Sequence, residues 1–364
     1  MNIVFLGTAS CFPTPSRGVS CTALQLEEGH VWLFDCGEGT QIQIQKSRIR
    51  PGKVNRIFIT HLHGDHVFGL PGLLCTLGNG GNTEKKSVHI YGPLGLRNLL
   101  ATTFEISGSP LPYDYHVHEL IPESWQFPTD REYNVTALER EYINPRETST
   151  TKILYDPITK SWPLFNDGKY IVVAGALTHR IPCFGFIIQE RDQLGSLDVK
   201  KLKELGLSPG PKYALLKNGK RVALDNGDVI EPLDVTGPIK KGRKIVILGD
   251  TCDNSPMTHL DMDCTIILHE ATMEESLREK AIQYGHSTPK MAAAFAAEIN
   301  AQRLCLFHVS PRYRPISSVT TSENEEDAEN LSAKILLDEA QNHLTKMEFK
   351  CGLDIAEDFG EIKL

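Results

Sequence analysis

The sequence has no apolar run close to the roughly 20 residues that a transmembrane helix needs. Its first residues, Met1–Gly7, lack a basic segment and pattern as a β-strand, so neither a secretory signal nor an Arg- and Ser-rich transit peptide is predicted. The nine cysteines include no C-x-x-C pair, and several lie in apolar surroundings, as Cys305 does. Such thiols predict a reduced, intracellular protein without disulfides, which we expect in the cytoplasm or the nucleus.

Positive charge is also scarce. The 38 Lys and Arg are outnumbered by 46 Asp and Glu, and the net charge of −8 argues against a nucleic-acid partner. The charge is uneven, however, because residues 191–244 hold twelve basic and seven acidic residues, about +5, which leaves about −13 elsewhere. A basic segment in an otherwise acidic chain could supply the electrostatic footprint that an RNA needs.

The remaining composition, 40% hydrophobic and 23% charged, is that of a globular protein, and 364 residues fit one large domain with an insertion. We expect a single α/β domain, 1–364, in which βαβ-like alternation forms a layered α/β/β/α sandwich. Residues 190–236 are polar, Lys-rich and interrupted by Ser208–Pro211, and we interpret them as an inserted arm. Strands are expected at 3–7, 21–26, 30–35, 54–60, 88–91, 170–177, 244–249, 264–269 and 303–309, and helices at 67–77, 94–105, 289–300 and 333–344.

The strongest chemical signal is Thr60–His66, which follows an apolar strand. It places three histidines and one aspartate within six residues. Side chains two residues apart on an extended segment, His61 and His63, point the same way, and Asp65 with His66 can turn toward a second position. Imidazole and carboxylate groups at this density predict a metal site.

Further ligand-type residues follow other expected strands: His179, Asp250, His269 and His308. Strand ends are where open α/β architectures place their active sites. We expect one metal at His61, His63 and His179, a second at Asp65, His66 and His308, and Asp250 as a bridge between the two. Nitrogen and carboxylate ligands without cysteine favour zinc, with manganese or iron possible.

Two such metals suit displacement at phosphorus, because they activate a water and neutralise phosphate oxygens. Asp65 could accept the proton of the water while it binds a metal. The leaving 3′-oxygen needs a proton, which His269 could donate.

Thr60–His66 resembles the T-H-x-H-x-D-H motif of the metallo-β-lactamase superfamily. The motif overlaps one of eight segments that resemble ribonuclease Z, the tRNA 3′-processing endonuclease, and most closely its short form in animals. These segments span roughly residues 1–345. They are Phe5–Thr8 with Pro13, Pro15 and Arg17; Phe34–Gln41; His61–Gly72; Leu177–Arg180; Gly249–Thr251; His269–Thr272; Gly285–Thr288; and Phe307–Tyr313.

The resemblance implies a metallo-β-lactamase fold, two zinc ions per chain, and hydrolysis that removes the 3′ trailer of precursor tRNA and leaves a 3′-hydroxyl on the tRNA. It implies that Asp35 orients a ligating histidine and that His269 and His286 lie near the scissile phosphate. Glu270 is expected to orient one of those two imidazoles. Arg312 and Ser310 are candidates for phosphate contact.

For residues 200–221, which hold seven basic residues and one acid, the resemblance implies a flexible arm that binds the body of the tRNA. It also implies a homodimer, in which one subunit's arm binds the tRNA that the other subunit cuts, with an interface near the helical segments after His66 and after Leu94. Ala214 and Gly18 depart from the usual glycine and asparagine of the family. The expected RNA-binding residues of the arm are Lys200, Lys201, Lys203, Gly210, Pro211 and Lys212.

Two other functions remain open. A related hydrolase of a thioester, a lactam or a small phosphodiester would keep the metal ligands but would not need a basic arm. An RNA-binding protein on an inactive hydrolase fold would lack a ligand, and none is missing here. His116 and His118 have ligand-like spacing, but their polar surroundings favour surface residues.

Overall fold

The computed structural model describes residues 1–78, 87–128, 146–224, 226–260, 263–318 and 332–364. The chain divides into two compact units. The first, which we call the sandwich unit, consists of residues 1–165, 172–188 and 244–364. The second, which we call the arm unit, consists of residues 166–171 and 189–243, and the expected arm, 190–236, lies within it.

The sandwich unit is built on two sheets. The first has eight strands in the order β17-β1-β2-β3-β4-β5-β6-β7, and its strands from β3 to β7 run parallel. Parallel neighbours bring their carboxyl ends to one edge, which gathers the residues that follow them. The strands are β1 (Asn2–Gly7), β2 (Cys21–Gln25), β3 (Val31–Phe34), β4 (Val54–Phe58), β5 (Ser87–Pro93), β6 (Asp114–Leu120), β7 (Glu147–Ile153) and β17 (Glu361–Lys363).

The second sheet has seven strands in the order β16-β15-β14-β13-β10-β9-β8, with β13 to β16 parallel. The strands β13, β14 and β15 are almost wholly buried and mostly apolar, as expected for parallel strands covered on both faces. The strands are β8 (Trp162–Asn166), β9 (Tyr170–Leu177), β10 (Cys183–Glu190), β13 (Lys244–Ile247), β14 (Ile266–Glu270), β15 (Arg303–Phe307) and β16 (Gly352–Ile355).

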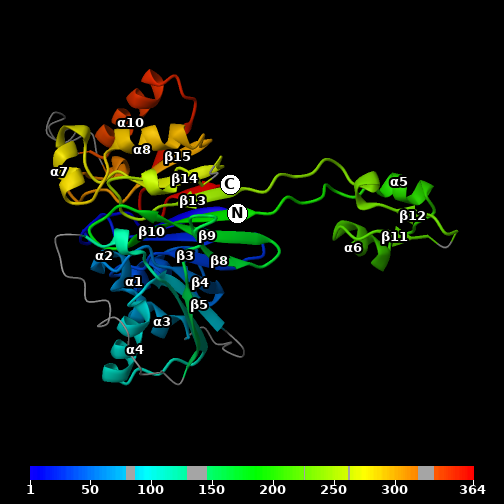
Figure 1. Cartoon of the computed structure of the whole chain (residues 1–364), viewed down its shortest axis with the longest axis horizontal. Coiled ribbons are helices and arrows are strands. Elements are labelled where there is room, and N and C mark those ends of the chain that lie inside the picture. The colour runs from blue at the N-terminus through cyan, green and yellow to red at the C-terminus, as the bar shows by residue number, and fades with distance from the viewer. Residues whose placement is uncertain (79–86, 129–145, 225, 261–262, 319–331) are drawn as a thin grey trace. The chain divides into compact units, whose positions relative to one another are not determined.

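Helices cover the outer face of each sheet, so the sandwich unit has four layers (Figure 1). On the first sheet, leucines such as Leu74 and Leu100 pack against Val88 and Ile90. The helices of this layer are α1 (Thr40–Lys46), α2 (Gly64–Val67), α3 (Leu70–Leu77) and α4 (Leu96–Ser107). On the second sheet lie α7 (Arg278–Gln283), α8 (Pro289–Glu298) and α10 (Lys334–Lys346). Short 3-10 helices connect the elements: η1 (Pro51–Lys53), η2 (Ser124–Gln126), η5 (Ser255–Met257), η6 (Glu275–Leu277) and η7 (Ile316–Ser318).

Aromatic side chains fill the space between the two sheets. Phe58 of β4 stacks on Phe34 of β3 with ring centroids 4.8 Å apart, and it lies 5.3 Å from Phe186 of β10. Trp32 is fully buried beside them. Large rings packed between sheets hold the strands, and therefore the residues at their ends, in fixed positions.

The arm unit has a small apolar core of its own: Leu202, Leu207, Leu216, Val222, Ile230 and Val235. Its elements are α5 (Val199–Glu204), α6 (Pro211–Lys217), β11 (Val222–Ala223), β12 (Val229–Ile230) and the 3-10 helix η4 (Pro232–Val235). Asp198 begins α5, because its side chain accepts a hydrogen bond from the backbone N–H of Lys201. The two ends of the arm pair with each other at Gln193 and Lys240.

The structure differs from the sequence-based expectation in several places. Strands β10, β16 and β17 and helices α1 and α7 have no counterpart among the expected elements. At the helix expected over 67–77, α2 ends at Val67 and a second helix, α3, begins at Leu70. Pro71 lies in the first turn of α3, where a proline favours the start of a helix. The stretch 106–168, in which no pattern was recognised, contains β6, β7 and β8. Five consecutive residues of β7 are exposed, so this edge strand lacks the apolar alternation that reveals half-buried strands.

Within the described residues, no helix has both the length and the apolar character that crossing a bilayer requires.

Candidate metal centre and active site

Seven ligand-type side chains follow strands of the two sheets. His61 and His63 lie on the loop after β4, and Asp65 and His66 lie on α2, which follows that loop. His179 follows β9, Asp250 follows β13 and His308 follows β15. Residues separated by up to 247 positions in the sequence therefore meet at the ends of these strands.

The first group consists of His61, His63, His179 and Asp250, whose ligand atoms all lie within 4.8 Å of one another. His63 Nδ1 is 3.1 Å from His61 Nε2 and 3.1 Å from His179 Nε2. Burial is the main cause that lowers the pKa of His63 and of His179 to about 4, and it also lowers the pKa of His61. All three imidazoles are therefore neutral at neutral pH, which is the form that binds metal.

The second group consists of Asp65, His66 and His308. His66 Nε2 and His308 Nε2 are 3.1 Å apart, and Asp65 Oδ2 lies 3.5 Å from His308 Nε2. Asp250 Oδ1 is 3.4 Å from His66 Nε2 and 3.3 Å from His308 Nε2, while its Oδ2 faces His61 at 3.6 Å. Asp250 thus presents one oxygen to each group.

Hydrogen bonds on the far side of the ring fix four of the five histidines: His61, His66, His179 and His308. His66 Nδ1 donates to Asp35 Oδ2 at 2.8 Å, and His179 Nδ1 donates to the Gly285 carbonyl oxygen at 2.7 Å. Carboxylate and carbonyl oxygens only accept, so both Nδ1 atoms carry protons and Nε2 points into the cluster. His61 Nδ1 and His308 Nδ1 lie 3.0 and 3.1 Å from the hydroxyls of Thr60 and Thr272.

These contacts fit a site for metal cations. Ring nitrogens that face each other at 3.1 Å need a proton or a cation between them. Burial alone would lower the pKa of His66, but Asp250, Asp35 and Asp65 raise it, which shows how much negative charge surrounds this position. Asp250 Oδ1 is buried, and among the described residues it has no hydrogen-bond partner. Divalent cations would satisfy the lone pairs and the carboxylates together.

His286, from the loop after α7, lies beside this cluster. Its Nδ1 is 3.0 Å from Glu270 Oε1 and 3.7 Å from Asp250 Oδ2, and 13% of its side chain is exposed. Burial would lower the pKa of His286, but Glu270 above all raises it to about 9. A histidine that is charged at neutral pH and open to solvent can donate a proton. Glu270 therefore orients His286 rather than His269.

The expectation that His269 lies at the scissile phosphate is wrong. His269 is fully buried, its Nε2 bonds to the Asn254 side chain at 2.8 Å and its Nδ1 donates to the Glu270 carbonyl oxygen at 2.7 Å. Its ring faces Phe295 of α8. Neighbouring residues on a strand point to opposite faces, so Glu270 of β14 faces the cluster and His269 faces the helices.

A cavity of about 390 Å³ opens on the cluster. Asp65 lines it, and its Oδ2 accepts a 2.7 Å hydrogen bond from the backbone N–H of Cys11. Sequence reasoning assigned no role to Cys11, to the Gly285 carbonyl or to Arg180, although Arg180 belongs to a segment that it singled out. The lining residues are Cys11, Phe12, Pro13, Val19, Glu38, His63, Gly64, Asp65, Phe68, Arg180, Asp250 and His286.

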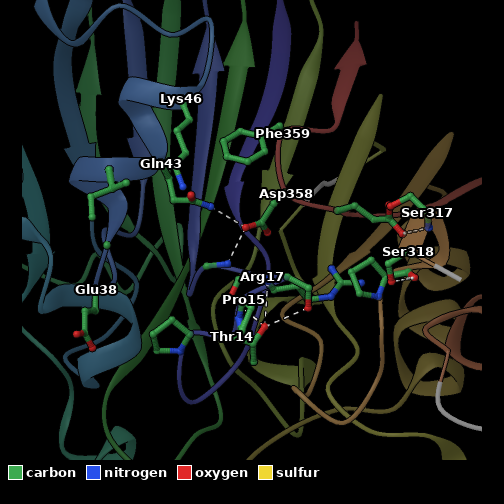
Figure 2. A pocket seen from close by; sticks show the side chains of 17 residues that line it. Thr14, Pro15, Arg17, Glu38, Gln43, Lys46, Ser317, Ser318, Asp358 and Phe359 are labelled. Carbon is green, nitrogen blue, oxygen red and sulfur yellow. Dashed lines mark hydrogen bonds between the residues drawn. The ribbon is translucent and has the colours of Figure 1, made fainter.

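A second cavity has a volume of about 620 Å³ and shares Pro13 and Glu38 with the first. Figure 2 shows this second cavity, with Glu38, Gln43 and Asp358 among its labelled lining residues. Asp358, near the C-terminus, accepts hydrogen bonds from Thr8 Oγ1 at 2.7 Å, from Gly18 N at 2.6 Å and from Gln43 Nε2 at 2.7 Å. The loop that carries Cys11 is therefore fixed by residues far away in the sequence.

The expected RNA-binding residues separate into two sets. Six lie in the arm unit, where Lys200, Lys201 and Lys203 are exposed on α5, and Gly210 and Pro211 start α6. Lys201 Nζ donates to the Asp234 carbonyl at 2.6 Å, and Lys212 Nζ donates to the Ala223 carbonyl at 3.1 Å. Arg312 lies in the sandwich unit, exposed, and it does not line the metal-side cavity.

His116 and His118, expected at the surface, are half-buried on β6. Both stack on His89 of β5, with centroids 4.5 and 5.3 Å away, and His118 also stacks on Tyr91. Within the described residues these histidines do not form a convergent group of three ligand atoms.

Comparison with known proteins yields close relatives. A family profile described as "Anti-Pycsar protein Apyc1" matches residues 1–100. Human zinc phosphodiesterase ELAC protein 1 is 43% identical over 368 residues, covering 100% of this chain and 98% of its own length. Ribonuclease Z of Bacillus cereus (strain ZK / E33L) is 39% identical over 316 residues, covering 86% and 90%.

Solved structures agree with the four-layer architecture. The crystal structure of human tRNase Z, short form (ELAC1), matches with a TM-score of 0.67 at 34% identity and covers 100% of this chain and 99% of its own. The metallo-beta-lactamase fold protein YhfI from Bacillus subtilis matches with a TM-score of 0.54 at 14% identity, over 99% and 98%. The expected metallo-β-lactamase fold is confirmed.

Proposed function

This chain belongs to the ribonuclease Z family, and from that membership we propose that it is a zinc-dependent endoribonuclease that removes the 3′ trailer of precursor tRNA and leaves a 3′-hydroxyl on the tRNA. The observation that carries the proposal is the convergence of His61, His63, His179, Asp250, Asp65, His66 and His308 at one cavity. An intracellular location, cytoplasmic or nuclear, follows from a precursor-tRNA substrate and is proposed on that ground.

We propose two zinc ions per chain. The first group of four ligands would hold one ion, and Asp65, His66 and His308 would hold the other. Asp250 would bridge them, since it presents one oxygen to each group. When bound, zinc supplies positive charge to a phosphodiester oxygen and makes a water more acidic.

The residues of the chain would perform the proton transfers. Asp65 Oδ2 lines the cavity and is oriented by the Cys11 N–H, so it is placed to accept the proton of the attacking water. His286 Nδ1 is held by Glu270, which leaves Nε2 to donate a proton to the leaving 3′-oxygen. His269 takes no part in this scheme.

The arm unit would bind the body of the tRNA through phosphate contacts. Lys200 and Lys203 are exposed on α5, and Gly210 and Pro211 present backbone at the start of α6. Phosphate contacts position a nucleic acid without reading its sequence. This role suits an enzyme that must process many tRNAs.

We also propose a homodimer with an interface near α3 and α4. An exposed apolar side chain supports this region, because Ile106 of α4 is 80% exposed. Sedimentation at concentrations where tRNA is processed should show a dimer, and a monomer there would contradict this part of the proposal.

The central test combines metal analysis with a cleavage assay. The purified chain should contain about two zinc ions, and it should cut a tRNA that carries a 3′ trailer at the base of the trailer. Product analysis should find a 3′-hydroxyl on the tRNA and a 5′-phosphate on the trailer. A preparation that contains no metal and cuts normally, or one that contains zinc and leaves the trailer intact, would contradict the proposal.

The alternative is a hydrolase of a small phosphodiester or a thioester. Because Gln193 and Lys240 exchange backbone hydrogen bonds of 2.9 and 2.8 Å, residues 194–239 can be replaced by a short Gly-Ser linker without separating the flanking chain. The armless variant should still hydrolyse bis(p-nitrophenyl) phosphate and should lose tRNA processing. Undiminished processing by the armless variant would show that the arm does not bind the tRNA. Hydrolysis of the small diester by the intact chain, without tRNA processing, would favour the alternative.

A further inference from the structure

Arg180 is placed at the cavity of the metal centre by the residue before it. His179 follows β9 and points into the first ligand group, and Arg180 continues the same loop to the cavity wall. Among the described residues that line this cavity, Arg180 is the only lysine or arginine. It is therefore the only side chain there with a permanent positive charge.

The side chain lies on the His286 side of the cavity. Arg180 Cγ is 3.3 Å from the position that a Cβ on Gly285 would occupy, so the aliphatic stem packs beside the backbone just before His286. Arg180 is exposed, and within the described part of the chain no hydrogen bond or ion pair engages its guanidinium. Its charge acts electrostatically on both His63 and His286. The guanidinium is thus free to bind a ligand at the cavity mouth.

We propose that Arg180 binds the substrate phosphate that immediately precedes the last nucleotide of the mature tRNA, one position 5′ of the scissile phosphate. This inference rests on the proposed function. The scissile phosphate belongs at the two ligand groups, which lie deeper than the exposed Arg180. His286 would protonate the leaving 3′-oxygen, which is on the tRNA side of the cut, and Arg180 lies on that same side. A guanidinium matches a phosphate with two parallel N–H donors.

This assignment gives Arg180 the phosphate contact that sequence reasoning gave to Arg312, which does not line the cavity. It also makes Arg180 a residue that positions the RNA strand on the tRNA side of the cut. A small diester has no second phosphate, so it gains nothing from this contact.

The first experiment compares Arg180→Gln, Arg180→Lys and wild type on trailer-bearing tRNA and on bis(p-nitrophenyl) phosphate. Arg180→Gln should lower kcat/KM on tRNA about 10- to 100-fold and flatten its log–log salt dependence by about one unit. Hydrolysis of the small diester should fall much less than tRNA processing, zinc content should match that of wild type, and Arg180→Lys should recover part of the loss on tRNA. The matched control is Arg50→Gln, an exposed arginine that lines neither cavity.

The second experiment removes the charge from the substrate instead. A methylphosphonate at the phosphate 5′ of the last mature nucleotide should slow wild type as much as Arg180→Gln does, and should slow Arg180→Gln no further. A methylphosphonate on the trailer side should slow both enzymes equally. Additive losses at the 5′ position, or equal losses of Arg180→Gln on tRNA and on the small diester, would overturn the inference. If wild type itself leaves the trailer uncut, the proposed function fails before Arg180 is tested.

Discussion

The metal centre of the sandwich unit and the phosphate-binding surface proposed for the arm unit are built in opposite ways. His61, His66 and His308 are fully buried, and each ring is held by a hydrogen bond on its far side. Lys200 and Lys203 are exposed on a helix of six residues, over an apolar core of six buried side chains. Bond-making chemistry needs atoms fixed to within fractions of an ångström, whereas attraction of a polyanion needs only charge in the right region.

This difference predicts how damage spreads in each region. A change in the metal centre should affect every substrate, because all of them use the same ligands. A change in the arm should affect only substrates long enough to reach it. Variants of the two regions therefore distinguish the two cases.

Asp65→Ala should reduce turnover about 1,000-fold or more on both trailer-bearing tRNA and bis(p-nitrophenyl) phosphate, because it removes a ligand and the proposed proton acceptor together. Circular dichroism should show an unchanged fold, and zinc content should fall below that of wild type. Full activity on either substrate would remove Asp65 from the mechanism.

Gly285→Ala should weaken zinc binding about 10- to 100-fold. A Cβ there would lie 2.5 Å from His179 Nδ1, on a backbone with φ of 78°, and would displace the carbonyl that orients His179. The matched control is Gly108→Ala, which has a similar φ of 61° but open space around its Cβ. Backbone strain should be alike in the two variants, because both glycines have a positive φ. A difference in zinc affinity, measured by chelator titration, therefore reports the changed geometry of His179. Equal zinc affinity in both would show that the Gly285 carbonyl does not orient His179.

Leu202→Ala should unfold the arm and leave the sandwich unit intact. The lost packing lowers the free energy of unfolding of the arm by about 2–5 kcal/mol. A core of six buried side chains contributes little stability beyond that amount. We expect kcat/KM on tRNA to fall about 10-fold or more, with the small diester unaffected. Leu205→Ala, at a side chain 42% exposed in the same segment, is the control and should change neither. A loss on both substrates would mean that the arm supports the metal centre.

The double variant Lys200→Gln and Lys203→Gln should have the smallest effect. Two lost phosphate contacts should weaken tRNA binding several-fold at low salt and flatten the salt dependence by about 1.4 to 1.8 units. Replacing the exposed Lys53 and Lys346 of the sandwich unit changes the net charge equally and serves as the control. If both double variants behave alike, the effect of α5 is one of overall charge and the arm has no specific contact there.

Some strands could be predicted from the sequence better than others. Apolar strands such as β13 and β15 stand out because their residues are buried on both faces, and the residues after them meet at one edge. His269 was misplaced because motif membership says nothing about which face of a strand a residue occupies. The carbonyl of Gly285 could not be predicted, since backbone atoms orient a ligand whatever the residue type.

Contacts between residues far apart in the sequence could not be predicted either. Arg180 carries no signal by itself, and only the cavity shows that no other lysine or arginine is among the described residues that line it. The hydrogen bonds of Asp358 to Thr8 and Gly18 join residues about 340 to 350 positions apart, which no local pattern reveals. The fold class could therefore be predicted from motifs, while the contacts that orient the motif residues required the structure.

Asp250 belongs to both ligand groups, with one oxygen in each. With this carboxylate shared, one side chain would decide the charge and the geometry of both groups. Loss of Asp250 should therefore empty both groups together, whereas loss of His63 or of Asp65 should weaken one group first.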